Sequence, residues 1–243
     1  MRVPSTKFKN AFGKYLNVAL EGNEVIITKN GKGVAKLKRY TEVYPSSIKE
    51  EAADYFVNKR ISYEEFQKIC ENSDARYELI DGVIYLLAAP SHSHQIAVTE
   101  LLVQLYRYFE DKSCTALTSP YDVKLYNDSE CFKDDPNVVQ PDLLVICDQE
   151  NIINNRYEGI PTLVIEVLSP STRRKDIYIK SQLYAKSGVK EYWIVDLKAQ
   201  SILQYDLTLE ETTFAKVHEF GQSFNSFYFK DLIIHTDKLL NLS

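Results

Sequence analysis

The chain has 243 residues, of which 44% are hydrophobic and 26% charged, and this ordinary composition excludes a fibrous or wholly disordered protein. No apolar run approaches the roughly 20 residues of a membrane-spanning helix, and the first residues lack the apolar core of a signal peptide. The four cysteines form no CxxC pair, so we expect neither a zinc site nor a disulfide framework. We therefore expect a reduced, cytoplasmic protein.

The charge is divided unevenly along the chain. Residues 1–40 hold nine Lys and Arg against two Glu, a net charge of +7, and because the whole chain carries −5 the remainder carries −12. This division predicts two modules, of which the basic one is a candidate for binding nucleic acid. The plainer alternative is a small basic domain with no such partner.

The first module, residues 1–40, is expected to contain one helix followed by a hairpin. Ser5 or Thr6 can cap a helix that begins near Lys7 and has an apolar stripe formed by Phe8, Ala11, Phe12, Tyr15, Leu16 and Ala19. The opposite face carries polar side chains that can contact phosphates and base edges of DNA, or can simply be solvated: Lys7, Asn10 and Lys14.

Asn30-Gly31 lies between two β-rich runs and predicts the turn of a two-residue hairpin. One helix and one hairpin make a thin core, so we expect a homodimer. The stretch from STKFKNAFGKYL to VIITKNGKGVAKL resembles the N-terminal domain of Phd/YefM-type antitoxins. The resemblance implies a dimer that binds operator DNA. In those antitoxins the next segment wraps a toxin, but residues 41–60 here read as a linker with a short helix at 48–59 before another domain, which disfavours a toxin partner.

The second module, residues 61–243, opens with a capping box formed by Ser62 and Glu65. In RYELIDGVIYLL a hairpin turns at Asp81-Gly82 and pairs Glu78 with Tyr85. A long helix is expected from about His94 to Phe109. The remaining elements are strands at 121–126, 141–147, 162–169 and 191–196, a capped helix at 171–188 ended by Gly188, and a last hairpin-like stretch from 201. This order predicts an α/β (α+β) fold around a mixed sheet.

A carboxylate stands in the middle of the apolar run LVIEVLS, and a second one begins the apolar run PDLLVIC. Because neighbouring strands lie about 4.8 Å apart, Glu166 and Asp142 can face one point. Oxygen ligands without His or Cys favour Mg²⁺ or Mn²⁺, which would also remove the cost of burying Glu166 unpaired.

Lys180 lies on the same helical stripe as Ile177 and Tyr184 and is expected to point inward, where it can support an attacking water or a phosphate. Two structural alternatives stay open. Lys180 can form an ordinary helix pair with Asp176, four residues earlier, or a structural salt bridge with Glu166.

The runs RYELIDGVIY, SHSHQ, QPDLLVI and LVIEVLSPSTRRKDIYIKSQLYAKSGVKEYWIVD resemble the Uma-two family of the PD-(D/E)XK nuclease superfamily. The resemblance implies a restriction-endonuclease-like core and metal-dependent hydrolysis of phosphodiester bonds. It assigns Asp142 and Glu166 to the acidic motifs and Glu78 as a further metal or water ligand. Leu168 stands where the superfamily has lysine, and Lys180 is the natural substitute.

Three further polar residues can line the cleft: His94, Gln140 and Asp176. Their simpler roles are a partly buried histidine, a strand-edge amide and a helix-pair partner. The sequence therefore predicts a Mg²⁺- or Mn²⁺-dependent endonuclease acting on DNA, with a basic DNA-binding head. The alternative is a non-catalytic DNA-binding regulator or antitoxin that uses the nuclease-like domain for dimerisation or partner binding.

Overall fold

The structure, a computed structural model, describes residues 2–20, 25–29, 31–37, 60–127, 131–153, 156–169, 172–173, 175–209 and 215–240, without the side chains of residues 10, 16, 17, 19, 20 and 156. The chain forms two compact units, residues 1–47 and 48–243. The predicted linker helix at 48–59, the turn residue Asn30 and the side chain of Asn10 lie outside the described residues.

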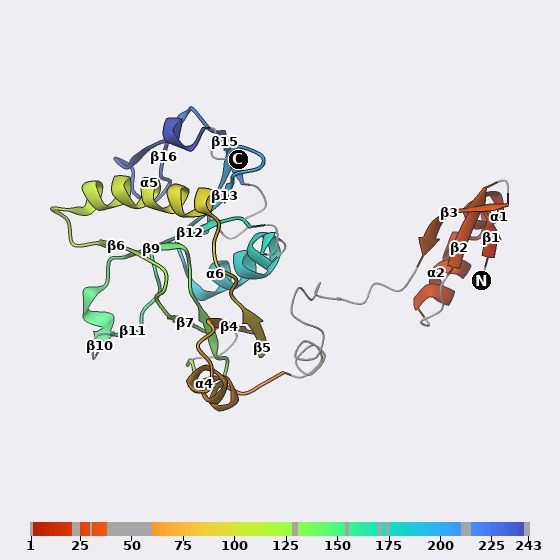
Figure 1. Cartoon of the computed structure of the whole chain (residues 1–243), viewed down its shortest axis with the longest axis horizontal. Coiled ribbons are helices and arrows are strands. Elements are labelled where there is room, and N and C mark those ends of the chain that lie inside the picture. Colours follow the sequence, from red (N-terminus) through yellow and green to blue (C-terminus); the bar gives the residue numbers. More distant parts are fainter. Residues whose placement is uncertain are drawn as a thin grey trace. The chain divides into compact units, whose positions relative to one another are not determined.

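The first unit is a three-stranded sheet with two short helices (Figure 1). Its elements are β1 (Arg2–Pro4), α1 (Ser5–Asn10), α2 (Phe12–Leu20), β2 (Val25–Lys29) and β3 (Lys32–Leu37). β1 runs parallel to β2, and β2 pairs antiparallel with β3, which confirms the predicted hairpin. A small core forms where Val3, Tyr15 and Val25 are buried.

Two expectations for this unit are wrong. The single helix is broken at Ala11, whose φ of −137° is not helical. Neither Ser5 nor Thr6 caps α1, because the chain leaves β1 at Pro4 and no side chain makes a cap hydrogen bond. Strand β1 itself was not indicated by its three residues. Lys7 and Lys14 are exposed, as expected, but Phe12 of the predicted apolar stripe is exposed too.

The second unit is built on two sheets. The larger has the strand order β15-β14-β13-β12-β9-β6, and the smaller has the order β5-β4-β8-β7. The large sheet is mixed, because β12 and β13 are parallel and its other pairs are antiparallel. Its strands are β6 (Thr115–Thr118), β9 (Leu143–Ile146), β12 (Leu163–Val167), β13 (Glu191–Asp196), β14 (Ser201–Asp206) and β15 (Lys216–Glu219).

The small sheet contains the predicted hairpin. Its strands are β4 (Tyr77–Ile80), β5 (Val83–Leu86), β7 (Val123–Leu125) and β8 (Asn137–Val139). Glu78 pairs with Tyr85 as expected, and the turn residues Asp81 and Gly82 have φ of 50° and 74°, the left-handed conformation of such a turn. Short ladders complete the unit: β10 (Ile152–Ile153) with β11 (Arg156–Tyr157), and β16 (Ser223–Asn225) with β17 (Ile233–His235).

Helices cover both faces of the large sheet. α5 (His92–Phe109) packs Leu101 and Leu105 against β9, β12 and β13 on one face. On the other face, Leu183 and Tyr184 of α6 (Ser181–Ser187) pack against Val164. The remaining helical segments are α4 (Tyr63–Glu71), η1 (Gln149–Asn151), η2 (Lys175–Lys180) and η3 (Asp237–Leu239). The mixed α/β class is therefore confirmed.

The capping box of α4 and the end of α6 at Gly188 are confirmed, whereas the predicted start of the helix at residue 171 lies outside the described residues. Ser62 and Glu65 form the capping box of α4, Ser91 caps α5, and Gly188 ends α6 with a φ of 94°. The helix predicted over 171–188 differs in its first part, because η2 is a π-helix rather than an α-helix. No helix among the described segments is both long and apolar enough to span a bilayer.

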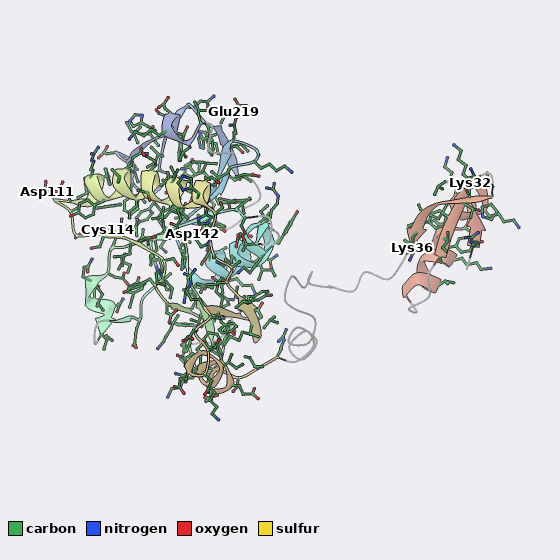
Figure 2. The ribbon with its side chains drawn as sticks, in the orientation of Figure 1. Lys32, Lys36, Asp111, Cys114, Asp142 and Glu219 are labelled. Atoms are coloured by element: carbon green, nitrogen blue, oxygen red, sulfur yellow. A yellow bond between two sulfur atoms is a disulfide. The ribbon has the colours of Figure 1, made fainter. Side chains whose placement is uncertain are left out.

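The expectation that no cysteines pair is wrong for Cys114 and Cys147. These residues form a disulfide with a Cα–Cα distance of 4.1 Å. Cys114 is labelled in Figure 2. They stand one position beyond the register pair Thr115–Ile146, so strand pairing brings them opposite each other. Their sequence separation of 33 residues gave no sign of this.

Candidate functional site

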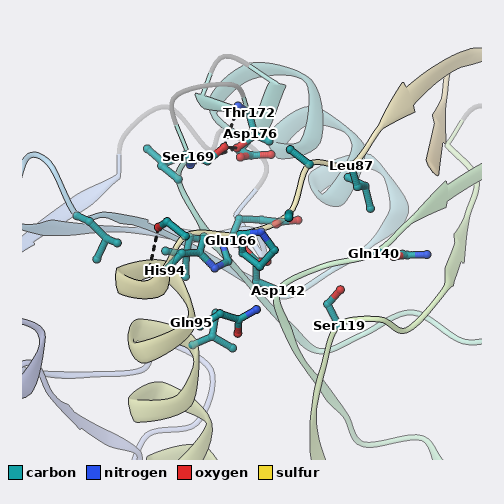
Figure 3. Close-up of a pocket in the computed structure, with 18 of the residues that line it drawn as sticks. Leu87, His94, Gln95, Ser119, Gln140, Asp142, Glu166, Ser169, Thr172 and Asp176 are labelled. Atoms are coloured by element: carbon teal, nitrogen blue, oxygen red, sulfur yellow. Dashed lines mark hydrogen bonds and ion pairs between the residues drawn. The ribbon is translucent and has the colours of Figure 1, made fainter. Parts of the chain in front are cut away.

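Strand pairing places two carboxylates side by side. β12 and β9 are antiparallel with Ile165 opposite Leu143, so the next positions, Glu166 and Asp142, also face each other. Side chains alternate along a strand, which puts Glu166 on the face shared with Val164 and toward α6. Figure 3 shows Asp142 and Glu166 together in the middle of the site, next to His94.

Glu166 is buried and only half satisfied. Its Oε1 accepts hydrogen bonds from Lys180 Nζ and Tyr184 OH, both at 2.7 Å, whereas no described residue donates to Oε2. Burial raises the pKa of Glu166 to about 8, against the attraction of Lys180 and with the repulsion of Asp176 and Asp142. Burial therefore favours the protonated form of this carboxyl.

Asp142 also keeps one oxygen open. Its Oδ2 accepts from the Val167 amide at 2.8 Å and lies 3.1 Å from His94 Nε2, and no described residue donates to Oδ1. Burial lowers the pKa of His94, but the hydrogen bond and the charge of Asp142 outweigh it, so the pKa is raised. His94 Nδ1 is buried and has no partner among the described residues.

Glu78 has a different position from the one predicted. It is fully buried and does not line the cavity that Asp142 and Glu166 face. Its Oε1 accepts hydrogen bonds from Lys180 Nζ at 2.7 Å and from the backbone N–H of Gln140 at 3.0 Å. Its Oε2 accepts a hydrogen bond from Lys175. Burial raises its pKa, but the two ammonium groups lower it to about 2. Because both oxygens are occupied, a role as metal ligand does not fit; Glu78 instead holds the two lysines.

The π-helix η2 explains why two lysines reach one carboxylate. In a π-helix residues i and i+5 are aligned, so Lys175 and Lys180 point the same way, and both are buried. An α-helix would turn Lys175 away, which is why sequence reasoning missed it. The predicted pair with Asp176 is long, since Lys180 Nζ lies 3.9 Å from Asp176 Oδ1, and the much closer Glu166 and Glu78 dominate.

A cavity of about 680 Å³ opens beside these groups. Its lining includes the two carboxylates that each keep one open oxygen, all three residues predicted to line the cleft, and Lys180: Asp142, Glu166, His94, Gln140, Asp176 and Lys180. Gln140 donates to Asp122 Oδ1 at 2.8 Å, while its own Oε1 is buried without a partner among the described residues. The site thus presents acceptor oxygens to a space the size of a small ligand.

The donor set suits Mg²⁺ or Mn²⁺ only in part. The described residues contain no group of three His, Cys, Asp or Glu side chains arranged to hold a metal ion. Asp142 and Glu166 nevertheless offer one open carboxylate oxygen each, and Mg²⁺ is commonly bound by one or two carboxylates while it keeps several waters. The two residues fit such an ion, and Glu78 is not needed for it.

Comparisons with known proteins agree with this fold. The family described as "Uma2: Putative restriction endonuclease" matches residues 63–228. An uncharacterized protein of Synechocystis sp. is 27% identical over 147 residues, which are 60% of this chain and 74% of the relative. The crystal structure of a "putative nuclease belonging to DUF820" from Anabaena variabilis has a TM-score of 0.60 at 20% identity, over 75% of this chain and 98% of that one. The family match begins at residue 63, so it gives no support to the antitoxin resemblance predicted for residues 1–40.

Proposed function

Because the chain belongs to the Uma2 family of putative restriction endonucleases, we propose that it is a divalent-metal-dependent endonuclease that hydrolyses phosphodiester bonds of DNA. The observation that carries this proposal is the facing pair Asp142 and Glu166, each with one open oxygen at the cavity. These two residues would hold Mg²⁺ or Mn²⁺. Such an ion supplies a Lewis acid for the phosphate and lowers the pKa of a bound water.

The chain's own residues have separate tasks in this proposal. Lys180 orients Glu166 through Oε1 and leaves Oε2 open, while its third N–H has no close acceptor because Asp176 is 3.9 Å away. That N–H is the one that can donate to an attacking water. Glu78 keeps the ammonium group in place. His94 fixes the Asp142 carboxylate through Oδ2.

The basic first unit is proposed to bind DNA. Residues 41–243, the linker and the second module together, carry a net charge of −12 and would be repelled by DNA, whereas residues 1–40 carry +7. Lys7 and Lys14 are exposed and can contact phosphates; Asn10 and a homodimeric state belong to the same proposal through the antitoxin resemblance. Replacing Lys7 and Lys14 together with Glu is expected to weaken plasmid binding and flatten its salt dependence, measured by filter binding at several salt concentrations.

Incubation with supercoiled plasmid in Mn²⁺ or Mg²⁺ tests the nuclease. We expect nicking by the parent protein that chelator abolishes and that Glu166→Gln lacks. Glu110→Gln, an equal change of charge at an exposed position, is the matched control and should nick like the parent. A parent that binds plasmid but never cuts it, with either ion, would contradict the nuclease proposal.

Plasmid binding without cutting would favour the alternative, a non-catalytic DNA-binding regulator. Two observations support it: Leu168 occupies the superfamily's lysine position, and the described residues lack a three-ligand metal group. In that case the Glu78–Lys180–Glu166 chain is a structural salt bridge that connects the two sheets.

A further inference from the structure

Arg76 is a half-buried cation without an acidic partner. It directly precedes β4 and lines the same cavity as Asp142 and Glu166. Its Nη1 donates a hydrogen bond to Ser119 Oγ at 3.1 Å, and no carboxylate in the described part of the chain forms an ion pair with it. A guanidinium group held by a neutral hydroxyl keeps its charge and most of its donors for a ligand, and its planar shape matches a phosphate.

The Arg76–Ser119 pair is tied to the Asp142 backbone. Ser119 N and Thr118 Oγ1 both donate to the Asp142 carbonyl, at 3.2 Å and 2.9 Å. Arg76 is anchored from its other side, because its carbonyl accepts from Leu87 N at 2.9 Å. Figure 3 shows Ser119 on the side of the cavity away from Thr172. The spacing between the guanidinium group and the Asp142 carboxylate is therefore fixed by hydrogen bonds.

The cavity needs such a cation if it admits a polyanion. Its two buried ammonium groups are already engaged, Lys180 by Glu78 and Glu166, and Lys175 by Glu78. The Asp142 carboxylate itself repels phosphate when no cation is bound. Lys198 also lines the cavity, but it is exposed and no described hydrogen bond fixes its ammonium group. Among the described residues that line the cavity, Arg76 is the cation that is both fixed in place and unused.

We infer that Arg76 and Ser119 form a phosphate subsite that binds a phosphodiester group of the nucleic-acid strand next to the bond to be cleaved. Arg76 supplies charged N–H donors. Ser119 Oγ accepts from Arg76 and keeps its own O–H to donate to the same phosphate. This inference rests on the proposed function, because it takes the Asp142–Glu166 pair as the place of cleavage.

The test uses the full chain without metal, so that nothing is hydrolysed. It is titrated with the dinucleotide TpT and with the uncharged methylphosphonate analogue of TpT, while ¹⁵N-labelled arginine side chains are followed by NMR. The Arg76 signal is assigned by its loss in Arg76→Gln. We expect TpT to shift this signal and to bind about tenfold more tightly than the analogue, as a charged hydrogen bond at a partly exposed site predicts.

The variants separate this subsite from general charge attraction. Arg76→Gln and Ser119→Ala should lose most of the preference for TpT, and Arg76→Lys should recover only part of it because lysine lacks the planar fork. Arg107→Gln removes an equal charge at an exposed position outside the cavity and should bind TpT like the parent. An Arg76 signal that does not move at millimolar TpT, or that moves equally with the analogue, overturns the inference.

Failure of the subsite and failure of the nuclease look different. A parent protein that shows the TpT-dependent shift but never nicks plasmid keeps the subsite and refutes the nuclease. Conversely, if the parent nicks plasmid and Arg76→Gln has the same KM as Arg107→Gln, the nuclease stands and the subsite is refuted.

Discussion

Glu166 and Glu191 are both buried carboxylates on neighbouring parallel strands, yet their surroundings differ completely. Both oxygens of Glu191 are filled by neutral donors that come from within the unit: Trp193 Nε1, Gln204 Nε2, Ser226 Oγ and the amides of Phe227 and Tyr228. Glu166 has two donors on one oxygen, one of them an ammonium group, and none among the described residues on the other.

The difference teaches that burial alone does not mark a functional acid. Glu191 is saturated, does not line the cavity of Asp142 and Glu166, and connects β13 to the segment after β16, so its carboxylate is structural. Glu166 lies at a cavity, faces a second carboxylate and keeps an acceptor free. The number of unfilled acceptor positions, not the exposed area, separates the structural Glu191 from the proposed metal ligand Glu166.

The largest expected effect is on activity at Glu166. If this carboxylate holds the metal, Glu166→Gln should lower the rate of plasmid nicking at least about a hundredfold, because an electrostatic group at the reacting phosphate is lost. Initial rates at equal concentrations of folded protein measure it. Retention of the parent's rate would place Glu166 with Glu191 as a structural acid.

Glu191→Ala should lower stability and leave activity nearly unchanged. It leaves several buried donors without an acceptor, so we expect the free energy of unfolding to fall by about 3 kcal/mol, measured by urea denaturation. The nicking rate per folded molecule should stay near that of the parent. A variant that stays as stable as the parent would show that water replaces the carboxylate and that Glu191 is not the structural anchor described here.

Glu166 should also make the stability of the protein depend on pH. The pKa of Glu166 is raised from 4.5 to about 8 in the folded state. Between these two pH values the folded state therefore keeps a proton that the unfolded state has lost. The metal-free protein should therefore become less stable as pH rises from about 5 to about 8. Glu166→Gln should lack this loss. Glu78 affects stability only below about pH 4.5, because its pKa is lowered from 4.5 to about 2 and stability therefore rises with pH in that range. The pH ranges in which Glu78 and Glu166 change the stability do not overlap.

Urea denaturation of the parent and of Glu166→Gln across this pH range measures the effect. Mn²⁺ binds the deprotonated carboxylate, so its affinity should rise with pH up to about 8 and level off above it. An affinity for Mn²⁺ that is independent of pH would mean that Glu166 is not a ligand.

The smallest expected effect is at Tyr184. Tyr184→Phe removes one of two donors to Glu166 Oε1, while Lys180 still donates to the same oxygen. We expect a loss of stability of about 1 kcal/mol and a few-fold change in nicking rate. A loss as large as that of Glu166→Gln would show that the tyrosine, rather than the lysine, orients the carboxylate.

Much of the site follows from local rules. Strand alternation and spacing predicted that Asp142 and Glu166 can face one point, and the helical stripe predicted that Lys180 points inward; the structure places all three accordingly. Their roles in metal binding and catalysis stay predictions. Glu78 was expected beside the metal, but its two lysine partners reach it across 97 and 102 residues of sequence, and periodicity cannot foresee such contacts.

The residues that sequence reasoning missed depend on geometry with no local signal. Lys175 turns inward only because η2 is a π-helix, and the pattern of apolar residues suggested an α-helix. Glu191 begins an apolar strand just as Asp142 does, and only donors up to 37 residues away reveal that it is saturated. The Cys114–Cys147 disulfide required knowledge of strand register.

The division into two sheets has a consequence for how the site responds to local motion. Glu78 is carried by β4 of the small sheet, which shares no strand pairing with the large sheet in the described residues, whereas Glu166 is carried by the large one. Lys180 is the link between them. When the small sheet opens locally, Lys180 is left with Glu166 and the long contact to Asp176. Hydrogen exchange of the β4–β5 amides thus reports how often Lys180 loses Glu78 as a partner. It does so although no acid of this hairpin lines the cavity.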